Sequence, residues 1–324
     1  MVPADAMLTW RAVADELRAG RVEGAARRVE RWTIFDETGP LHDAGRDRAA
    51  AMMSWVARRG DADELFNAYR HAVGPWYMSS VRASGEGGAT SGIAIDAEFI
   101  RAFVALGAVR GFEIADIEED DDSVTFRVRM SGEKLLQEGY YDPAGHARFV
   151  HVDGPHPMTF MRDRYDVYNV HEAVGNLLMV EAGLAPPSAK SLPDDAGFIR
   201  QRYSKCQCAV PAEEWATLGI EDGRQPCREP GRHRTHLDAA ARQRLLRPTE
   251  SVVGELLAVG DVADALVLLE GLEARWLRIC DIYRQWPALV GEWVLGRWGV
   301  DAVEELHADA DRIVREGLRV RAGG

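Results

Sequence analysis

The feature that most constrains the fold of this 324-residue sequence is a helical segment near its start that recurs near its end. The first copy covers roughly residues 8–72 and the second roughly residues 249–314. Aligning residues 16–19 (ELRA) with residues 255–258 (ELLA) requires an offset of 239. Because internal self-similarity marks duplicated structural units, the sequence predicts two similar helical units, one on each side of the remaining chain.

A second pair of matches supports the repeat. Asp43 aligns with Asp281 and Trp55 with Trp293, both at an offset of 238, so each copy has an acid twelve residues before a tryptophan. A change of one residue in the offset is what a small change in a loop produces. The copies are therefore expected to be diverged versions of one unit.

Each copy also carries a polar stripe, because residues three and four apart share one face of a helix. The stripes consist of Asp43, Asp47, Ala50 and Ser54 in the first copy and of Asp281, Gln285, Ala288 and Glu292 in the second. Two interpretations stay open. The stripes line a cleft between the copies, with His42, Asp43 and Trp55 as substrate-binding residues, or they face solvent while the tryptophans lie in the core. The solvated stripe is the commoner arrangement.

The segment between the copies has a different pattern. Apolar and polar residues alternate at 112–117 and at 124–129 around an acidic turn, which is typical of a β-hairpin. Three short strands and one helix are also expected: 147–152, 158–162, 198–209 and 166–182. Since strands and helices do not alternate as βαβ units, the predicted fold class is α+β and mainly helical, with a small central antiparallel sheet flanked by the two helical units.

These changes of pattern divide the chain into three predicted units. They are an N-terminal helical unit (1–83), a mixed central segment (93–236) and a C-terminal helical unit (237–324). Glycine and proline are expected to end helices within the units. The expected helices of the N-terminal unit cover 4–31, 41–59 and 62–73, with Pro40 as a break, and Gly260 and Gly299 are the expected breaks near the end.

Composition narrows the classes of partner. Lysine and arginine number 39 and aspartate and glutamate 52, giving a net charge of -13, so neither nucleic acid nor an anionic membrane is an expected partner. No run approaches the ~18 apolar residues of a membrane span, and the start lacks the regions of a signal peptide. The sequence predicts a cytoplasmic protein of bacterial type that acts on a small-molecule ligand.

Three of the four cysteines, Cys206, Cys208 and Cys227, lie within 22 residues. A disulfide framework is not expected in a cytoplasmic chain of this size. Cys206 and Cys208 would face the same side of a strand, and with Cys227 and a nearby histidine they could hold zinc, although the spacing is not that of a standard finger. Alternatively, Cys208 or Cys206 is a catalytic thiolate, or both are inert buried thiols.

The helix expected at 166–182 begins with polar and aromatic residues. Asp166 is its expected N-cap, and the positive end of the helix dipole would lie near Tyr168 and Asn169, which makes these two candidate substrate-binding residues. His171 is a candidate general base. It shares a helix face with apolar residues, however, so a histidine satisfied within the core is the commoner interpretation.

The loop HVDGPHP at 151–157 is a further candidate. Rigid loops that carry titratable groups are often functional, so His151 is a candidate substrate-binding residue. The two histidines and the aspartate of this loop could also ligate a metal, or could simply be exposed.

These features of the middle segment resemble the L-2-amino-thiazoline-4-carboxylic acid hydrolases of bacteria. The resemblance covers roughly residues 93–210 and depends on four stretches: 118–122, 130–132, 168–183 and 200–208. It implies hydrolysis of a C–N or C–S bond in a small amino-acid-like molecule, with Cys208 or Cys206 as the residue involved. Met130 stands where the family pattern suggests a cysteine, and His171 has no thiol beside it, so a family thiol or metal site would be depleted in this chain.

The sequence thus leads to a small-molecule enzyme as its first functional hypothesis, a hydrolase, cyclase or lyase with His171 as base and Cys208 as nucleophile or metal ligand. The alternative is a non-catalytic ligand-binding or sensor protein whose tryptophans line the site. A homodimer with tryptophans buried between subunits is a third expectation. Zinc is the one cofactor for which the sequence offers ligands.

Overall fold

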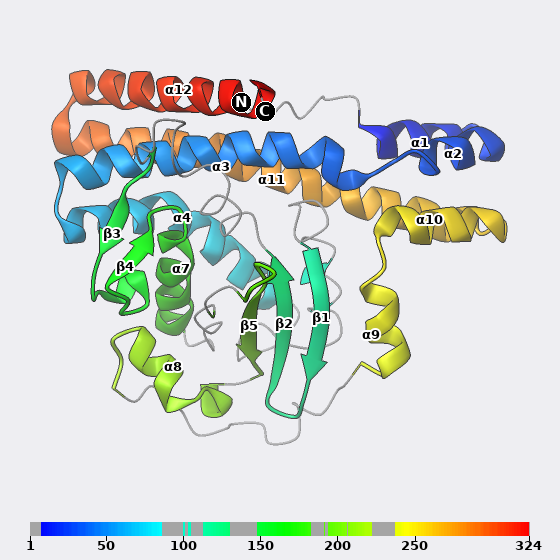
Figure 1. Ribbon diagram of the computed structural model, residues 1–324, viewed down its shortest axis with the longest axis horizontal. Coiled ribbons are helices and arrows are strands. Elements are labelled where there is room, and N and C mark those ends of the chain that lie inside the picture. The colour runs from blue at the N-terminus through cyan, green and yellow to red at the C-terminus, as the bar shows by residue number, and fades with distance from the viewer. Residues whose placement is uncertain are drawn as a thin grey trace.

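The computed structural model of the chain describes residues 8–85, 100, 103–104, 113–129, 148–182, 191, 194–205, 207–221 and 237–323. Two long helices, α3 (Ile34–Arg59) and α11 (Val262–Trp298), run side by side, and α12 (Val300–Gly323) packs along them (Figure 1). Two small antiparallel sheets lie on the other side of this layer. The mainly helical α+β fold is therefore confirmed. No described helix is long and apolar enough to cross a membrane.

One end of the molecule is a bundle built from the beginnings of both copies. It contains α1 (Thr9–Arg18), α2 (Val22–Val29), α10 (Thr249–Ala258) and the first half of α11. Their apolar faces enclose a core in which Trp10 meets Trp276 edge to face, with ring centroids 6.0 Å apart. Helices of one copy pack against helices of the other here: α1 of the first copy packs against α11 of the second, and α2 of the first packs against α10 of the second.

The first helix ends in the same way in both copies. Gly20 and Gly260 have φ angles of +74° and +80°, a region that glycine enters without a steric cost. Their N–H groups donate to the carbonyl oxygens of Leu17 and Leu257, which closes each helix with a glycine C-cap. These turns lie 240 residues apart. The offset of 239 expected from the sequence is therefore one residue too small at this point.

The second bundle contains α3, α4 (Ala62–Gly85), α12 and the second half of α11. Here too the two copies pack against each other: α3 of the first copy packs against α12 of the second, and α4 of the first packs against α11 of the second. Where α3 meets α11, a Cβ atom on Gly45 would lie 2.5 Å from the ring of Tyr283. Positions 45 and 283 correspond in the repeat at the offset of 238, so equivalent positions face each other, as expected for an approximate two-fold relation.

Several helix boundaries differ from those expected. The helix predicted over 4–31 is divided at Gly20 into α1 and α2. Helix α3 passes through Pro40, and the hydroxyl of Thr38 donates to the carbonyl oxygen of Ile34 at 2.9 Å in the turn before it. Helix α4 passes through Pro75 to Gly85. Burial of these helices in the bundle offsets the one backbone hydrogen bond that each proline removes. The breaks at Gly260 and Gly299 are confirmed.

The predicted hairpin is confirmed. Strand β1 (Glu113–Glu119) pairs with β2 (Ser123–Arg129), which pairs with β5 (Ile199–Ser204), and both pairings are antiparallel. Alternate residues of these strands form a third core, whose buried members include Ile117, Val124, Phe126, Val128 and Ile199. A buried ion pair between Lys205 and Glu119, 3.0 Å apart, closes the end of this sheet. Two short helices complete the fold, α8 (Ala212–Thr217) and α9 (Ala239–Leu245).

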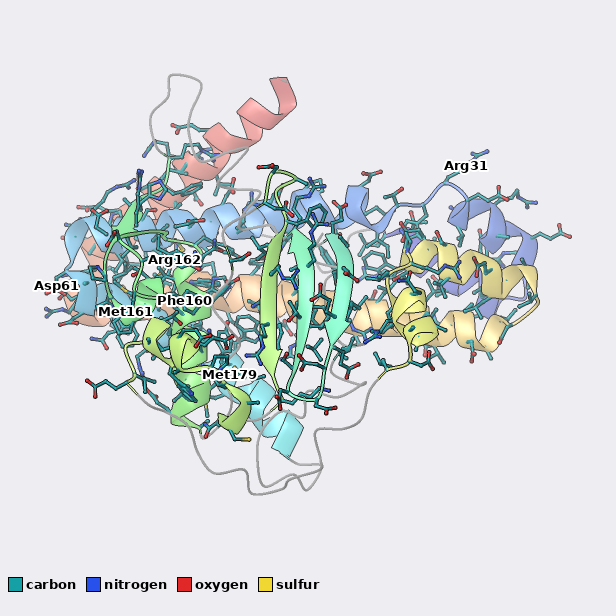
Figure 2. The ribbon with its side chains drawn as sticks, turned by 60° about the horizontal axis from the view of Figure 1, so that its bottom comes forward. Arg31, Asp61, Phe160, Met161, Arg162 and Met179 are labelled. Atoms are coloured by element: carbon teal, nitrogen blue, oxygen red, sulfur yellow. The ribbon has the colours of Figure 1, made fainter. Side chains whose placement is uncertain are left out.

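A two-stranded ribbon of β3 (His151–Asp153) and β4 (Arg164–Asp166) lies beside the C-terminal end of α3. The strand expected at 158–162 is wrong, because this stretch contains the turn η1 (Pro157–Thr159) and then Phe160 and Met161 with left-handed φ angles. Figure 2 shows this loop at the same end of the molecule as Asp61, and far from Arg31.

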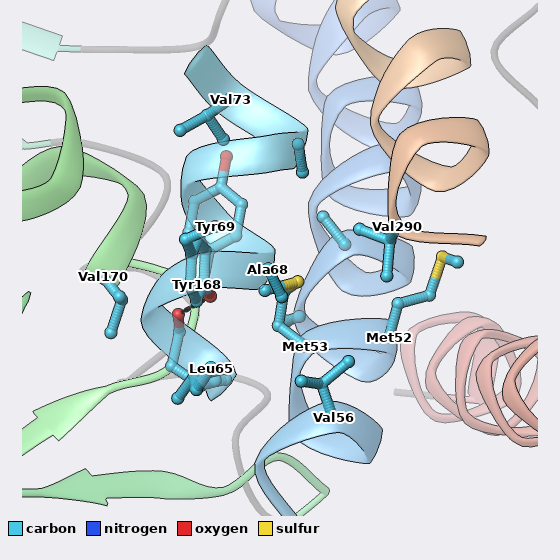
Figure 3. Packing of buried hydrophobic residues seen from close by; sticks show 14 of the residues in the cluster. Met52, Met53, Val56, Leu65, Ala68, Tyr69, Val73, Tyr168, Val170 and Val290 are labelled. Atoms are coloured by element: carbon cyan, nitrogen blue, oxygen red, sulfur yellow. Dashed lines mark hydrogen bonds between the residues drawn. The ribbon is translucent and has the colours of Figure 1, made fainter. Parts of the chain in front are cut away.

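Helix α7 (Val170–Glu181) packs against α4. The predicted helix is therefore confirmed, but Asn169 and not Asp166 is its N-cap residue, and Asp166 belongs to β4. The hydroxyl of Tyr69 in α4 donates to the carbonyl oxygen of Val167 just before α7. Figure 3 shows the surrounding core, where side chains of α3, α4 and α11 meet those of Tyr168 and Val170.

Candidate functional site

The polar stripe of α3 is buried, whereas the corresponding stripe of α11 is not. Asp47, Ala50 and Ser54 have no exposed surface. All four members of the α11 stripe, Asp281, Gln285, Ala288 and Glu292, are exposed. The stripe of the second copy is therefore solvated, whereas that of the first copy is buried apart from the half-buried Asp43. Of the two tryptophans, Trp55 is buried in the core and Trp293 is partly buried.

The segment at 148–150 covers the stripe of α3. The guanidinium group of Arg148 lies 3.4 Å from the Oδ2 atom of Asp47 and donates to the carbonyl oxygen of Ile313 in α12 at 3.0 Å. Two helical turns further along α3, the N–H of Val150 donates to the Oγ atom of Ser54 at 3.1 Å. These contacts fix the start of β3 along α3.

Two of the predicted substrate-binding residues take part in the contact between α3 and α11. His42 is buried and hydrogen bonds to the hydroxyl of Tyr283. Asp43 lies 3.0 Å from Arg46, which also pairs with Asp47 at 3.2 Å. Burial lowers the pKa of Arg46, but the neighbouring carboxylates raise it by more, so that its net pKa is raised. These contacts give both residues a structural role, and their binding of a substrate stays a prediction.

Two open hollows adjoin where the buried stripe ends. The β3 hollow has a volume of about 500 Å³ and is lined by Arg58, Phe149, Val150, His151, Asp153 and Arg164. The α12 hollow has a volume of about 580 Å³ and is lined by Trp55, Arg58, Arg59, Glu305, Ala308, Asp309 and Arg312. Because Arg58 lines both, the hollows are neighbours. His151 and Trp55, two predicted binding residues from distant parts of the sequence, thus line neighbouring hollows. The β3 hollow and the α12 hollow together are called the groove.

The charges of the α12 hollow largely compensate one another. Arg59 pairs with Glu305, and Arg312 pairs with Asp309. Among the described residues, Arg58 makes one longer contact, with its Nη1 atom 3.4 Å from the Oδ2 atom of Asp309. The α12 hollow is therefore close to neutral, and Arg58 supplies the excess positive charge.

The β3 hollow is positive. His151, Asp153 and Arg164 lie on one face of the ribbon, and the alternate residues Val152 and Tyr165 lie on the other, in the core. Arg164 is exposed and has no hydrogen-bond or ion-pair partner among the described residues, although Asp153 is opposite it in the register.

The same positive charge acts on the histidine of the hollow. Burial lowers the pKa of His151, the charge of Arg164 lowers it further, and Asp153 opposes both effects. Asp166 stands opposite His151 in the register of the ribbon. The neutral imidazole of His151 is therefore favoured.

The predicted catalytic histidine lies in the aromatic core. The ring centroid of His171 is 4.8 Å from that of Tyr168 and 5.4 Å from that of Trp286. Its Nδ1 atom is 2.5 Å from the carbonyl oxygen of Tyr168. Tyr168 and Asn169 are buried as well. These contacts agree with a structural histidine, and a catalytic role for His171 stays a prediction.

The cysteines differ from expectation. Cys208 lies in the turn η2 (Gln207–Ala209), beyond the end of β5, and not on the expected strand. It is disulfide-bonded, which the sequence analysis did not anticipate. In this oxidised form Cys208 supplies neither a thiolate nucleophile nor a zinc ligand.

The predicted zinc ligands Cys206 and Cys227 lie outside the described residues. Within the part that the structure describes, no group of three or more His, Cys, Asp or Glu residues could hold a metal ion. Cys280 is a free, buried cysteine, and burial raises its pKa to about 11.

Comparisons of the chain with protein-family models, with curated proteins and with solved structures found no match. The resemblance of the middle segment to the hydrolases is thus neither supported nor opposed by a relative. Arg58 and Arg164, which the sequence analysis missed, define the most distinctive arrangement of charge on the described groove.

Proposed function

We propose that this protein binds a small anionic molecule in the β3 hollow, and so acts as a ligand-binding or sensor protein. The observation that carries the proposal is the meeting of Arg58, from α3, and Arg164, from β4, at one hollow. Guanidinium groups are the side chains best suited to carboxylate and phosphate groups. Two of them converge here in a chain whose net charge is -13.

The size of the groove agrees with a small ligand. Pockets for small molecules usually measure about 300–1,000 Å³, and each hollow falls within this range. The charged end of the ligand would lie between Arg58 and Arg164, and its remainder would extend into the nearly neutral α12 hollow.

Isothermal titration calorimetry with acetate, citrate, phosphate and sulfate at constant ionic strength tests this proposal. We expect saturable binding of at least one anion, weakened about 10- to 100-fold by Arg58→Ala or Arg164→Ala, which is the effect of losing one hydrogen bond to a charged group. Arg297→Ala is the matched control, because Arg297 is an exposed arginine of α11 paired with Glu64.

Two results would contradict the proposal. One is the absence of saturable binding by any of the four anions. The other is binding that Arg164→Ala leaves at the wild-type affinity, since the anion would then lie elsewhere.

A further inference from the structure

The β3 hollow is lined by nitrogen donors from three secondary-structure elements. Arg58 comes from α3, His151 from β3 and Arg164 from β4. A planar carboxylate is satisfied by the two parallel hydrogen bonds of a single guanidinium group. A tetrahedral oxyanion presents oxygens that do not share a plane, and donors from several elements match it better. The arrangement of donors therefore favours a tetrahedral oxyanion over a carboxylate.

Asp153 provides a second criterion. It lines the same hollow, on the same face of the ribbon as His151 and Arg164. A carboxylate repels a neighbouring anion, unless that anion carries a proton that the carboxylate can accept in a hydrogen bond. Sulfate carries no proton at neutral pH. Inorganic phosphate retains at least one, and a phosphate monoester, with a second pKa of about 6, retains one in part.

We propose that the β3 hollow is a phosphate site. Arg58 and Arg164 neutralise the phosphate, His151 donates a hydrogen bond to it, and Asp153 accepts the hydrogen bond of the P–OH group. This inference rests on the anion binding proposed above and names its chemical class. The phosphate is either inorganic phosphate or the end of a monoester whose organic part lies in the α12 hollow.

Calorimetry on the full chain at pH 7 tests the class of anion. Phosphate is expected to bind about 10- to 100-fold more tightly than sulfate, the effect of one hydrogen bond to a charged group. In Asp153→Asn this ratio is expected to fall close to one, mainly because sulfate binds better once the negative charge is removed. Asp63→Asn, at an exposed aspartate of α4, is the control and is expected to keep the wild-type ratio.

The outcomes separate this inference from the proposed function. Equal affinities of phosphate and sulfate in the wild type, or a ratio that Asp153→Asn does not change, would overturn the phosphate site while leaving anion binding intact. If neither phosphate nor sulfate binds, the phosphate site is overturned, and the proposed function fails with it only if acetate and citrate do not bind either.

Phenyl phosphate distinguishes the two sources of the phosphate group. Tighter binding of phenyl phosphate than of inorganic phosphate, abolished by filling the α12 hollow with Ala308→Trp, supports a monoester. Equal affinities of the two, both unaffected by Ala308→Trp, support inorganic phosphate.

Discussion

Replacing Asp47 by asparagine is expected to destabilise the fold strongly. The Asp47 side chain has no exposed surface, and its carboxylate lies 3.2 Å from Arg46 and 3.4 Å from Arg148. Both guanidinium groups are themselves buried, with 3% and 6% of their side chains exposed. The substitution keeps the size of the side chain and removes one buried negative charge from beside two buried positive charges.

Breaking a buried ion pair from one side costs about 3–5 kcal/mol. Arg46 keeps its contact with Asp43, and Arg148 keeps its hydrogen bond to the carbonyl oxygen of Ile313. For this reason we expect the lower end of that range, a loss of about 3 kcal/mol in the free energy of unfolding.

Urea unfolding followed by circular dichroism measures this loss. The midpoint is expected to fall while the dependence of the free energy on urea stays the same. Gln285→Ala is the control, because Gln285 is the exposed counterpart of Asp47 in the repeat, and we expect it to change the stability by less than about 0.5 kcal/mol. A loss below about 1 kcal/mol in Asp47→Asn would refute the claim that Asp47 stabilises the two buried guanidinium groups, because removing the central carboxylate of such a network costs more than that.

The remaining predictions concern the groove, a thiol and the helix crossing. Phosphate affinity, measured by calorimetry, is expected to rise as the pH falls from 8 to 6, because a bound anion favours protonated His151. His151→Gln is expected to reduce the accompanying proton uptake to that of the phosphate group itself. Without phosphate, lowering the pH is expected to destabilise the protein, because the pKa of His151 is lowered in the folded state. The stabilising contribution of His151 is present above the pKa of an unfolded histidine and is lost as the pH falls through the folded value. Urea unfolding midpoints are therefore expected to fall more with decreasing pH in the wild type than in His151→Gln. Cys280, with a pKa of about 11, is expected not to react with a thiol reagent at pH 8 until the protein unfolds; Cys280→Ser is expected to lower the thiol count of the unfolded state alone. Gly45→Ala is expected to destabilise by about 1–3 kcal/mol, because its Cβ would lie 2.5 Å from the ring of Tyr283, and Tyr283→Ala is expected to reduce that cost.

The repeat was predictable because it depends on local patterns that survive divergence. Helical periodicity and the acid–tryptophan spacing are visible in both copies. The register at the first helix was wrong by one residue, because identical letters favoured the offset of 239. Burial shows that the correct offset at this helix is 240, because Leu17 and Leu257, which are 240 residues apart, are both buried in the same core. The extra length of the first copy lies further on: 22 residues separate Gly20 from His42, but 20 separate Gly260 from Cys280.

The site was predictable only in part. His151 and Trp55 were candidates, each for a local reason, but nothing in their spacing indicates that both adjoin Arg58. Arg58 itself carries no signal among the many arginines of the chain. The role of Arg164 depends on the register of β3 with β4, which places it on the same face as His151. Contacts of this kind join segments distant in the sequence, and no local pattern encodes them.

Which of the two polar stripes would be buried could not be read from their composition, because both are polar and both lie beside a tryptophan. The difference arises from residues 148–150, which pack on the polar stripe of α3, whereas the described part of the middle segment meets α11 at Trp286 and not at its polar stripe. Ser54 accepts the hydrogen bond of Val150 and Arg58 lines both hollows, whereas the corresponding positions of α11 hold Glu292 and Gly296, which are exposed. An unmodified duplication would offer two equal surfaces. The changes at these positions leave α11 without the arginine and without the hydroxyl that fix β3 on α3. The groove therefore depends on residues of α3 that differ from their counterparts in α11, and its ligand would depend on the contact that holds β3 against α3.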